Sequence, residues 1–342
     1  MFQDGLQELS LINPFGGQVW YAETLSSTMD TARDLAAQGK PHGTVIAADF
    51  QTAGRGRRGR SWSARRGENL FFTILLRYAG YAAIPAALTL RAGLAVGLAI
   101  EDFFLFLKDS SLKGKKILAE KDSSLKEKHF LAEKDSSLEK KDFLTEKVCF
   151  LEKKDFLAEK VSSLEKKDFS LEDKKSLEEK RKKEEKETVR IKWPNDIMLG
   201  GRKAAGILAE GDGQTVYLGI GVNVAQKEFP PELREKAVSI ALFCGGGVFP
   251  EDRFILLEMI LARLFESLSR ACDWRTRLSE RLYMQGKPVR FIPGAPNSPK
   301  VVEGILHGIG PSGELLLIPS GNTAPVSFTT GELDVYGKHA FF

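Results

Sequence analysis

Cysteine is scarce in this chain. The 342 residues include only Cys149, Cys244 and Cys272, which lie far apart in the sequence. An odd number at wide spacing argues against a disulfide framework and against a cysteine metal site, and it favours unpaired thiols in a reducing compartment. We therefore expect a cytoplasmic protein, and we assign no metal-ligating residues.

An excess of charge of one sign is also lacking, because the net charge is only +4. Nucleic acids and membrane surfaces are bound by basic residues gathered on one face, which this composition does not predict by itself. Residues 1–10 lack the basic and apolar stretches of a secretory signal. We also expect no apolar run long enough to span a bilayer. The sequence thus predicts neither DNA nor a membrane as a partner.

Residues 108–187 differ in composition from the rest of the chain. Lysine and glutamate dominate there, and leucine recurs every 13 residues in phase with Asp-Ser-Ser-Leu and Leu-Glu-Lys-Lys-Asp-Phe motifs, which marks a tandem repeat. A 13-residue step does not bring the leucines onto one helical face. We expect a solvated insertion, helical or disordered. The alternative is an arm that binds a partner.

One interrupted domain flanks this insertion. An apolar helix is predicted over 84–104 and a strand over 189–193, which is an ordinary α/β connection. Further along, 204–210 and 215–224 predict a hairpin around Gly211-Asp212-Gly213, and 250–272 has helical spacing. Short strands broken by glycine and proline follow at 289–292, 301–309, 314–318 and 325–329, as in a small β-barrel. The predicted parts are one domain formed by 1–107 and 188–284, the insertion 108–187, and a barrel over 285–342.

The segment from Gly54 to Trp62 interleaves four arginines with three glycines and ends on the tryptophan. Arginine forks match phosphate oxygens bidentately, and glycines let backbone N–H groups approach an anion. Strand-like runs lie on both sides, at 44–48 and 69–76. This setting favours a structured phosphate-binding loop over a disordered tail that binds nucleic acid.

Further motifs suit a ligand site. A serine-threonine pair opens a predicted helix, where it can cap the helix or bond a ligand, and glycines in a strand admit a ligand to the backbone. In chain order the motifs are Ser26-Ser27-Thr28-Met29-Asp30, Gln51, Lys192-Trp193-Pro194-Asn195-Asp196, Arg202-Lys203-Ala204-Ala205-Gly206-Ile207-Leu208 and Leu218-Gly219-Ile220-Gly221-Val222-Asn223-Val224.

Together with the arginine loop, these motifs resemble the biotin protein ligases, in the family's order and over 21–106 and 188–336. The resemblance implies an α+β fold, with a mixed-sheet catalytic domain of the biotin/lipoate ligase type and a small C-terminal SH3-like barrel. It also implies an enzyme that uses ATP and Mg²⁺ to form biotinyl-5′-AMP and then biotinylates a lysine of a biotin carboxyl carrier protein. About 20 residues precede the first predicted catalytic strand, too few for a DNA-binding domain, so we expect the monofunctional type. Such ligases can form homodimers through sheet edges.

The resemblance also implies the site residues. An acyl-adenylate brings a carboxylate against a phosphate, so cations must neutralise both. The positions matched to catalysis are Lys203, Arg57, Asp196 and Lys192. Those matched to ligand binding are Ser27, Thr28, Met29, Gln51, Gly54, Arg55, Gly56, Arg57, Trp62, Lys203, Gly219, Gly221 and Asn223.

Several of these roles have alternatives. Lys203 is either the lysine on the biotin carboxylate or a surface residue. Asp196 either binds Mg²⁺ or takes a proton from the incoming amine, and Trp62 either contacts adenine or packs in the core. Arg58 and Arg60 are either direct ligands or positioning charges.

The function has alternatives too. A lipoate or octanoate ligase shares the fold, but the arginine loop and the C-terminal barrel favour biotin. In a different class of protein, a non-enzymatic scaffold, the charged repeat would be the working part and the ligase-like core only its carrier.

Overall fold

The computed structural model describes residues 5–60, 62, 64–124, 189–294 and 301–335, with the backbone alone for 109–124. The chain divides into two compact units, residues 1–109 with 186–342 and residues 110–185. Most of the 13-residue repeat lies outside the described residues. The helical or disordered state expected for 108–187 therefore stays a prediction, as do the predicted domain boundaries.

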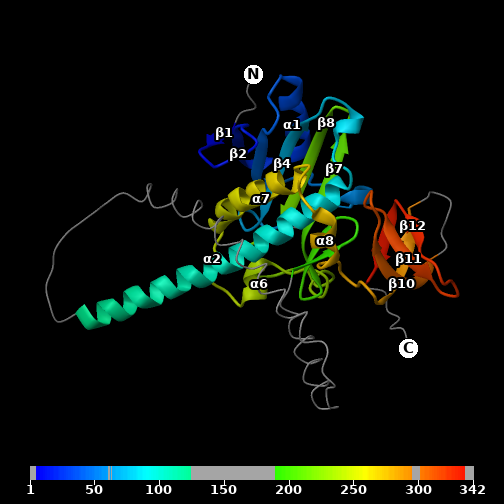
Figure 1. Cartoon of the computed structure of the whole chain (residues 1–342). Coiled ribbons are helices and arrows are strands. Elements are labelled where there is room, and N and C mark those ends of the chain that lie inside the picture. Colours follow the sequence, from blue (N-terminus) through cyan, green and yellow to red (C-terminus); the bar gives the residue numbers. More distant parts are fainter. Residues whose placement is uncertain (1–4, 61, 63, 125–188, 295–300, 336–342) are drawn as a thin grey trace, which may run out of the picture. The chain divides into compact units, whose positions relative to one another are not determined.

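An eight-stranded sheet forms the centre of the first unit, in the order β1-β2-β3-β4-β8-β7-β6-β5. Strands β2 and β3 are parallel, and every other neighbouring pair is antiparallel, so the predicted mixed sheet is confirmed (Figure 1). The strands are β1 (Gln7–Leu9), β2 (Val19–Leu25), β3 (Val45–Gln51), β4 (Leu70–Arg77), β5 (Val189–Lys192), β6 (Asp196–Leu199), β7 (Arg202–Gly211) and β8 (Thr215–Val222).

Helices cover both faces of this sheet. Alternate side chains of a strand point to opposite faces, and on β2 Tyr21 packs in one apolar core while Trp20 packs in another. The Tyr21 core contains α2 and α7, and the Trp20 core contains α1. The helices are α1 (Thr28–Ala37), α2 (Leu88–Ser124), α6 (Ile240–Cys244), α7 (Asp252–Leu268) and α8 (Trp274–Ser279), with the short 3-10 turns η1 (Arg57–Gly59) and η2 (Tyr81–Ala83).

Helix α2 is longer and more apolar than expected. It continues to Ser124 rather than ending near residue 104. The segment Tyr81–Lys108 is long and apolar enough to cross a membrane by length and composition, contrary to our expectation, but 61% of its most apolar window is buried inside the protein. The physical reason is that α2 serves two cores: Val96 packs toward the large sheet, whereas Leu90 and Leu94 pack toward the C-terminal sheet.

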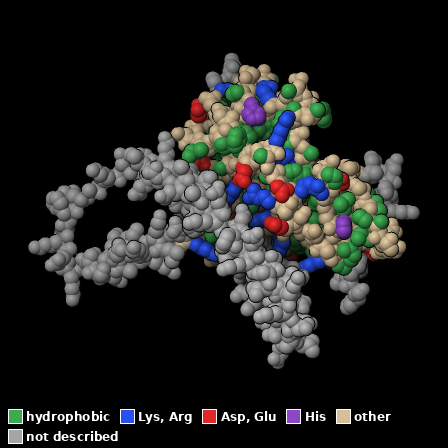
Figure 2. Space-filling model, in the orientation of Figure 1, with side chains coloured by type: hydrophobic (Ala, Val, Ile, Leu, Met, Phe, Trp, Pro, Cys, Tyr) green, Lys and Arg blue, Asp and Glu red, His purple; other side chains and the backbone are tan. Residues whose placement is uncertain are grey.

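Ion pairs join α2, α7 and α8. Arg263 of α7 pairs with Asp102 of α2 at 2.7 Å, and Arg277 of α8 pairs with Glu266 of α7 at 2.8 Å. Figure 2 shows acidic and basic side chains gathered near the middle of the visible face. Mixed charges on this face fit the modest net charge of the chain.

The C-terminal part is a five-stranded antiparallel sheet in the order β12-β11-β10-β9-β13. Four of its strands fall on predicted runs, but β13 was missed because four residues, two of them acidic, give little strand signal. Phe291, Leu306 and Leu317 form its core together with Trp193. The strands are β9 (Pro288–Pro293), β10 (Val302–Ile309), β11 (Leu315–Pro319), β12 (Val326–Phe328) and β13 (Gly331–Asp334).

Candidate active site

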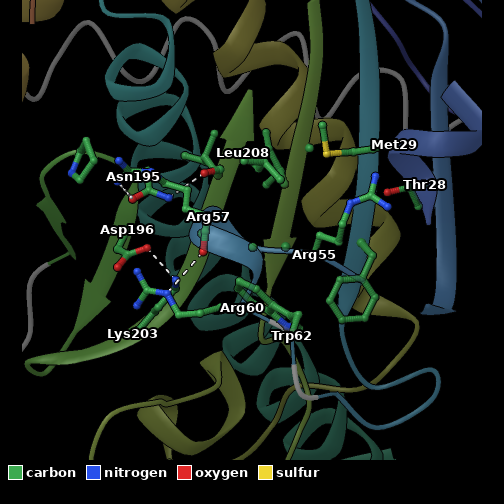
Figure 3. A pocket seen from close by; sticks show the side chains of 18 of the residues that line it. Thr28, Met29, Arg55, Arg57, Arg60, Trp62, Asn195, Asp196, Lys203 and Leu208 are labelled. Atoms are coloured by element: carbon green, nitrogen blue, oxygen red, sulfur yellow. Dashed lines mark hydrogen bonds and ion pairs between the residues drawn. The ribbon is translucent and has the colours of Figure 1, made fainter. Parts of the chain in front are cut away.

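A pocket lies on the α1 face of the large sheet and gathers residues from every predicted motif (Figure 3). All predicted site residues line it except two. Asn223 lines an adjoining pocket, and Gly54 lies next to Gln51 without lining the pocket. The predicted residues that line this pocket are Ser27, Thr28, Met29, Gln51, Arg55, Gly56, Arg57, Trp62, Lys192, Asp196, Lys203, Gly219 and Gly221.

One end of the pocket is polar and pre-organised. Ser27 caps α1, because its hydroxyl accepts a hydrogen bond from the backbone N–H of Met29 at 3.2 Å. Thr28 donates to Gln51 Oε1 from both its backbone N–H, at 2.9 Å, and its hydroxyl, at 3.1 Å. The Thr28 hydroxyl in turn accepts from Thr73 at 2.9 Å. These buried groups are held by one another, so a ligand meets them in a fixed geometry.

Glycines form the floor of the pocket. A Cβ built on Gly219 would lie 3.1 Å from Met29 Sδ, and one built on Gly221 would lie 3.2 Å from the Trp62 indole. A Cβ on Gly206, a lining residue that we did not predict as such, would lie 2.9 Å from both the Trp62 ring and Lys203 Nζ. The indole therefore lies against bare backbone on β7 and β8, where larger residues would not fit.

The other end of the pocket is cationic. Lys203 Nζ lies 2.6 Å from Asp196 Oδ1, and Lys192 Nζ lies 4.0 Å from Asp196 Oδ2. Arg57 donates to Asn195 Oδ1 at 3.2 Å. Two lysines thus share the Asp196 carboxylate, while Arg57 is bound to the neighbouring amide; Figure 3 shows Lys203, Asp196, Arg57 and Asn195 together. This balance favours an anionic ligand.

Burial acts on two of these cations. Lys192 is only 5% exposed, and desolvation lowers its pKa while the nearby Asp196 carboxylate opposes the shift. Desolvation also lowers the pKa of Arg57, with a further contribution from Arg58. Burial thus penalises the charged form of both side chains, and an arriving anion would offset that penalty.

The remaining loop arginines are bound to acids. Arg55 pairs with Asp30, while Arg58 and Arg60 both reach Glu332 of β13, at 3.4 and 2.8 Å. In this arrangement Arg58 and Arg60 fit the positioning role better than the ligand role. Sequence reasoning missed Glu332, since it stands in a strand that carries no motif.

A second pocket adjoins the first and shares Arg60, Trp62, Lys192, Asp196, Lys203 and Glu332 with it. Asn223 is 4% exposed here; its Nδ2 donates to Val238 O at 3.2 Å, while its Oδ1 has no hydrogen-bond partner in the described protein. A buried acceptor without a partner needs a ligand or water to offset its desolvation. The rest of the wall is mostly apolar and was not predicted from sequence; it includes Phe229, Leu233, Ala237, Ile292, Leu333 and Val335.

Within the described residues, no group of three or more His, Cys, Asp or Glu side chains could hold a metal ion. Asp196 and Glu332 are the carboxylates of the first pocket, and both are already paired with cations. Cys244 and Cys272 are free thiols away from both pockets, and Cys149 lies outside the described residues.

Comparison with known proteins places these features in a family context. Residues 21–120 and 140–224 match the family described as "Biotin/lipoate A/B protein ligase family". The chain is 26% identical over 253 residues to the bifunctional ligase/repressor BirA of Bacillus subtilis, covering 72% of this chain and 52% of the relative. It is 36% identical over 137 residues to the biotin–[acetyl-CoA-carboxylase] ligase of Paracoccus denitrificans, covering 37% and 55%.

The chain thus spans about half the length of the curated relatives it matches. Among solved structures, the biotin protein ligase of Aquifex aeolicus in complex with biotin and ATP superposes with a TM-score of 0.58 at 20% identity, covering 92% of this chain and 97% of that one. At this level of identity, the similarity establishes the fold.

Proposed function

We propose, from the premise that the chain belongs to the biotin/lipoate A/B protein ligase family, that it is an ATP-dependent biotin–protein ligase. The observation that carries this proposal is the convergence of the arginine loop, Lys203 and the polar cluster of Ser27, Thr28 and Gln51 on one pocket. A molecule with a polar head, an apolar middle and an anionic end matches that order of surfaces. Biotin has these three parts.

In the first half-reaction, the polar cluster holds the ureido head and the glycine floor accepts the ring system. The biotin carboxylate then lies at the cationic end, where its oxygen attacks the α-phosphorus of ATP and pyrophosphate leaves with the electrons of the broken P–O bond. Lys203 and Arg57 neutralise the charge of both reactants, and most of that stabilisation is electrostatic. Asp196 keeps the ammonium of Lys203 in place.

The adjoining pocket suits the nucleotide. Its apolar walls fit a purine, and the unpaired Oδ1 of Asn223 is an acceptor for the exocyclic amine of adenine. Mg²⁺ would enter bound to the phosphate oxygens of ATP, since Mg²⁺ is commonly held by substrate phosphates together with one or two carboxylates. Asp196 is a carboxylate shared by both pockets, and it already forms an ion pair with Lys203.

In the second half-reaction, the amine of an acceptor lysine attacks the acyl carbon of the adenylate, and AMP leaves. The mixed anhydride is already an activated acyl donor, so no enzyme nucleophile and none of the cysteines is required. Asp196 is our candidate to receive the proton of the amine. The acceptor that fits this chemistry is a biotin carboxyl carrier protein, as in the name of the Paracoccus relative.

The pocket favours biotin over lipoate. Thr28 and Gln51 bury hydrogen-bonding groups at its inner end. These groups already bond one another, and a ureido head adds N–H and C=O partners for their remaining donors and acceptors, which the dithiolane of lipoate lacks. The polar end of the pocket is therefore expected to discriminate between the two vitamins.

We further propose that the C-terminal sheet is the SH3-like barrel of this family. Its support is the antiparallel five-strand order, the register shift between Leu306 and Gly308 that bends β10, and the single core around Phe291. A homodimer and a cytoplasmic location complete the proposal.

The test is acceptor labelling. Purified protein is incubated with an acceptor domain, ATP and either biotin or lipoate, and modification of the acceptor lysine is measured by mass spectrometry. We expect biotinylation that depends on ATP. Absence of any modification would reject the proposed ligase activity. Modification by lipoate in preference to biotin would reverse the choice of substrate.

A further inference from the structure

Asp30 occupies an unusual position beside the pocket. It stands in the first turn of α1, directly after Thr28 and Met29, yet its carboxylate is not among the described groups that line the pocket. Arg55 donates to both of its oxygens, at 2.8 and 2.6 Å. Such bidentate pairs are the strongest and most directional of side-chain ion pairs. Hydrogen bonding from Arg55 accordingly holds the pKa of Asp30 below its usual value, against a smaller opposing effect of burial.

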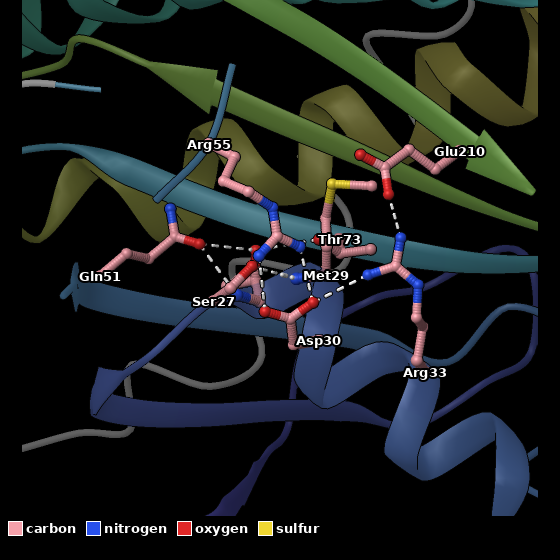
Figure 4. Close-up of polar contacts among 9 residues, drawn as sticks. Ser27, Met29, Asp30, Arg33, Gln51, Arg55, Thr73 and Glu210 are labelled. Atoms are coloured by element: carbon pink, nitrogen blue, oxygen red, sulfur yellow. Dashed lines mark hydrogen bonds and ion pairs between the residues drawn. The ribbon is translucent and has the colours of Figure 1, made fainter. Parts of the chain in front are cut away.

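The ion pairs continue across α1 to the sheet (Figure 4). Arg33, one turn further along α1, donates to Asp30 Oδ1 at 2.8 Å, and its other terminal nitrogen pairs with Glu210 of β7. Glu210 lies on the same face of β7 as Leu208, which lines the pocket. The row Arg55, Asp30, Arg33 and Glu210 therefore links the arginine loop, α1 and β7 along one rim of the pocket.

A backbone hydrogen bond also joins the start of the arginine loop to the segment before α1, at the polar end of the pocket. Ala53 N–H donates to Ser26 O at 2.9 Å, so the start of the loop runs beside the residues before α1. The Arg55 and Asp30 side chains are 41% and 39% exposed. A link this open to water contributes little to the folded core and responds to salt. Its effect is therefore expected on the loop rather than on overall stability.

We propose that Asp30 is a positioning residue: by binding Arg55 it holds the start of the arginine loop against α1 and slows the escape of biotin. This inference rests on the proposed function, because biotin is the ligand whose escape is measured. Asp30 acts through Arg55 and not by touching the ligand.

The variants are Asp30→Asn, which keeps the shape and removes the charge, and Asp34→Asn, a matched control one turn along the same helix. Asp34 is exposed and lines neither of the pockets described above. Asp30→Glu, which keeps the charge, is the conservative rescue. Arg55→Gln alone and the double variant Asp30→Asn with Arg55→Gln complete a mutant cycle.

The first readout is the biotin dissociation rate of the full chain, measured by stopped flow at low salt and at 1 M NaCl. We expect Asp30→Asn to raise it roughly fivefold, as for a partly exposed bidentate pair, with the ATP KM and kcat nearly unchanged. At 1 M NaCl, where the Debye length is about 3 Å, the difference should shrink. Asp30→Glu should restore part of the slow rate, and Asp30→Asn should add little to the dissociation rate once Arg55→Gln is present.

The second readout needs no ligand. An arginine-specific protease should cut within residues 54–62 faster in Asp30→Asn than in Asp34→Asn, as followed by mass spectrometry. If wild-type protein fails to bind biotin, the proposed function fails while this readout still tests the link. Equal cleavage rates and equal biotin dissociation rates in Asp30→Asn and Asp34→Asn would overturn the inference. A change in the KM of both biotin and ATP in Asp30→Asn that does not depend on salt would overturn it as well.

Discussion

At the scale of single residues, the proposed chemistry depends on the lysines and arginines of the first pocket, which outnumber its carboxylates. Lys203 is the cation in closest contact with Asp196, at 2.6 Å, and it also lies 5.2 Å from the centre of the Trp62 ring. It is therefore held between a carboxylate and an aromatic face, at the cationic end of the pocket where the acyl-adenylate would form. Removing its charge should affect the reaction more than the binding of biotin.

Lys203→Gln is expected to slow adenylate formation by about 10²–10³-fold, the effect of deleting one electrostatic contact in a transition state, with the biotin Kd changed only a fewfold. Single-turnover formation of biotinyl-5′-AMP and calorimetric titration of biotin measure the two effects. Lys227→Gln, at an exposed position, is the control and should behave as wild type. A Lys203→Gln enzyme that kept its full single-turnover rate would show that this ammonium plays no part in the chemistry.

Tyr21 makes a separate prediction about pH. Burial, followed by the hydrogen bond to Asp49 at 2.6 Å, raises the pKa of Tyr21 from 10.0 to about 12. Its contribution to stability is therefore complete below pH 10, where the unfolded chain also keeps the phenol protonated, and is lost as pH rises toward 12. Tyr21→Phe should flatten the fall in the free energy of unfolding between pH 10 and 12, as measured by urea denaturation. An unchanged slope would exclude this residue as a cause of alkaline unfolding.

Sequence reasoning located the pocket residues because loops and strands that bind small molecules leave local signals. The arginine loop, Gly219 and Gly221 were all identified, and they meet. Glu332 and Asp30 were not assigned roles, because a carboxylate that binds an arginine far away in sequence has no local pattern. Only the fold reveals such pairs.

At the scale of elements, the predicted strands and helices largely hold, and the differences have physical causes. No element was predicted between residues 193 and 204, but Asp196 begins β6 after a tight turn. Helix α2 was expected to end earlier, because its apolar residues stop near residue 107. Lysine and glutamate are good helix formers, however, so the helix continues to Ser124.

Helix α2 should be the element on which the Tyr21 core and the core of the C-terminal sheet both depend. Leu94 is fully buried between α2 and the C-terminal sheet, so Leu94→Ala should lower the free energy of unfolding by about 2–5 kcal/mol. Leu242→Ala, at a position 41% exposed, should cost far less. Chemical denaturation of the two variants measures the difference, and equal losses would contradict the assignment of Leu94 to the core.

At the scale of the whole molecule, every residue assigned to the pocket belongs to the unit formed by 1–109 and 186–342. The charged repeat contributes no described lining residue to either pocket. Two hypotheses therefore make opposite predictions: a ligase works without the repeat, whereas a scaffold works through it.

Replacing residues 110–185 with a flexible Gly/Ser linker should leave biotin affinity within about twofold of wild type, since such linkers impose little structure. Calorimetric titration of biotin checks this, with the full-length wild-type chain as the reference. Loss of biotin binding from a folded, shortened protein would assign the repeat a role in the site.

The central claim is that the arginine loop and Lys203 bring biotin and ATP together where the two adjoining pockets meet. It is tested most directly by the release of pyrophosphate from ATP by the purified full chain, without acceptor, as biotin is added. The account predicts about one pyrophosphate per active site, released only with biotin and nearly abolished on the same timescale in Lys203→Gln. Release that does not depend on biotin, or no release from folded protein, would contradict it.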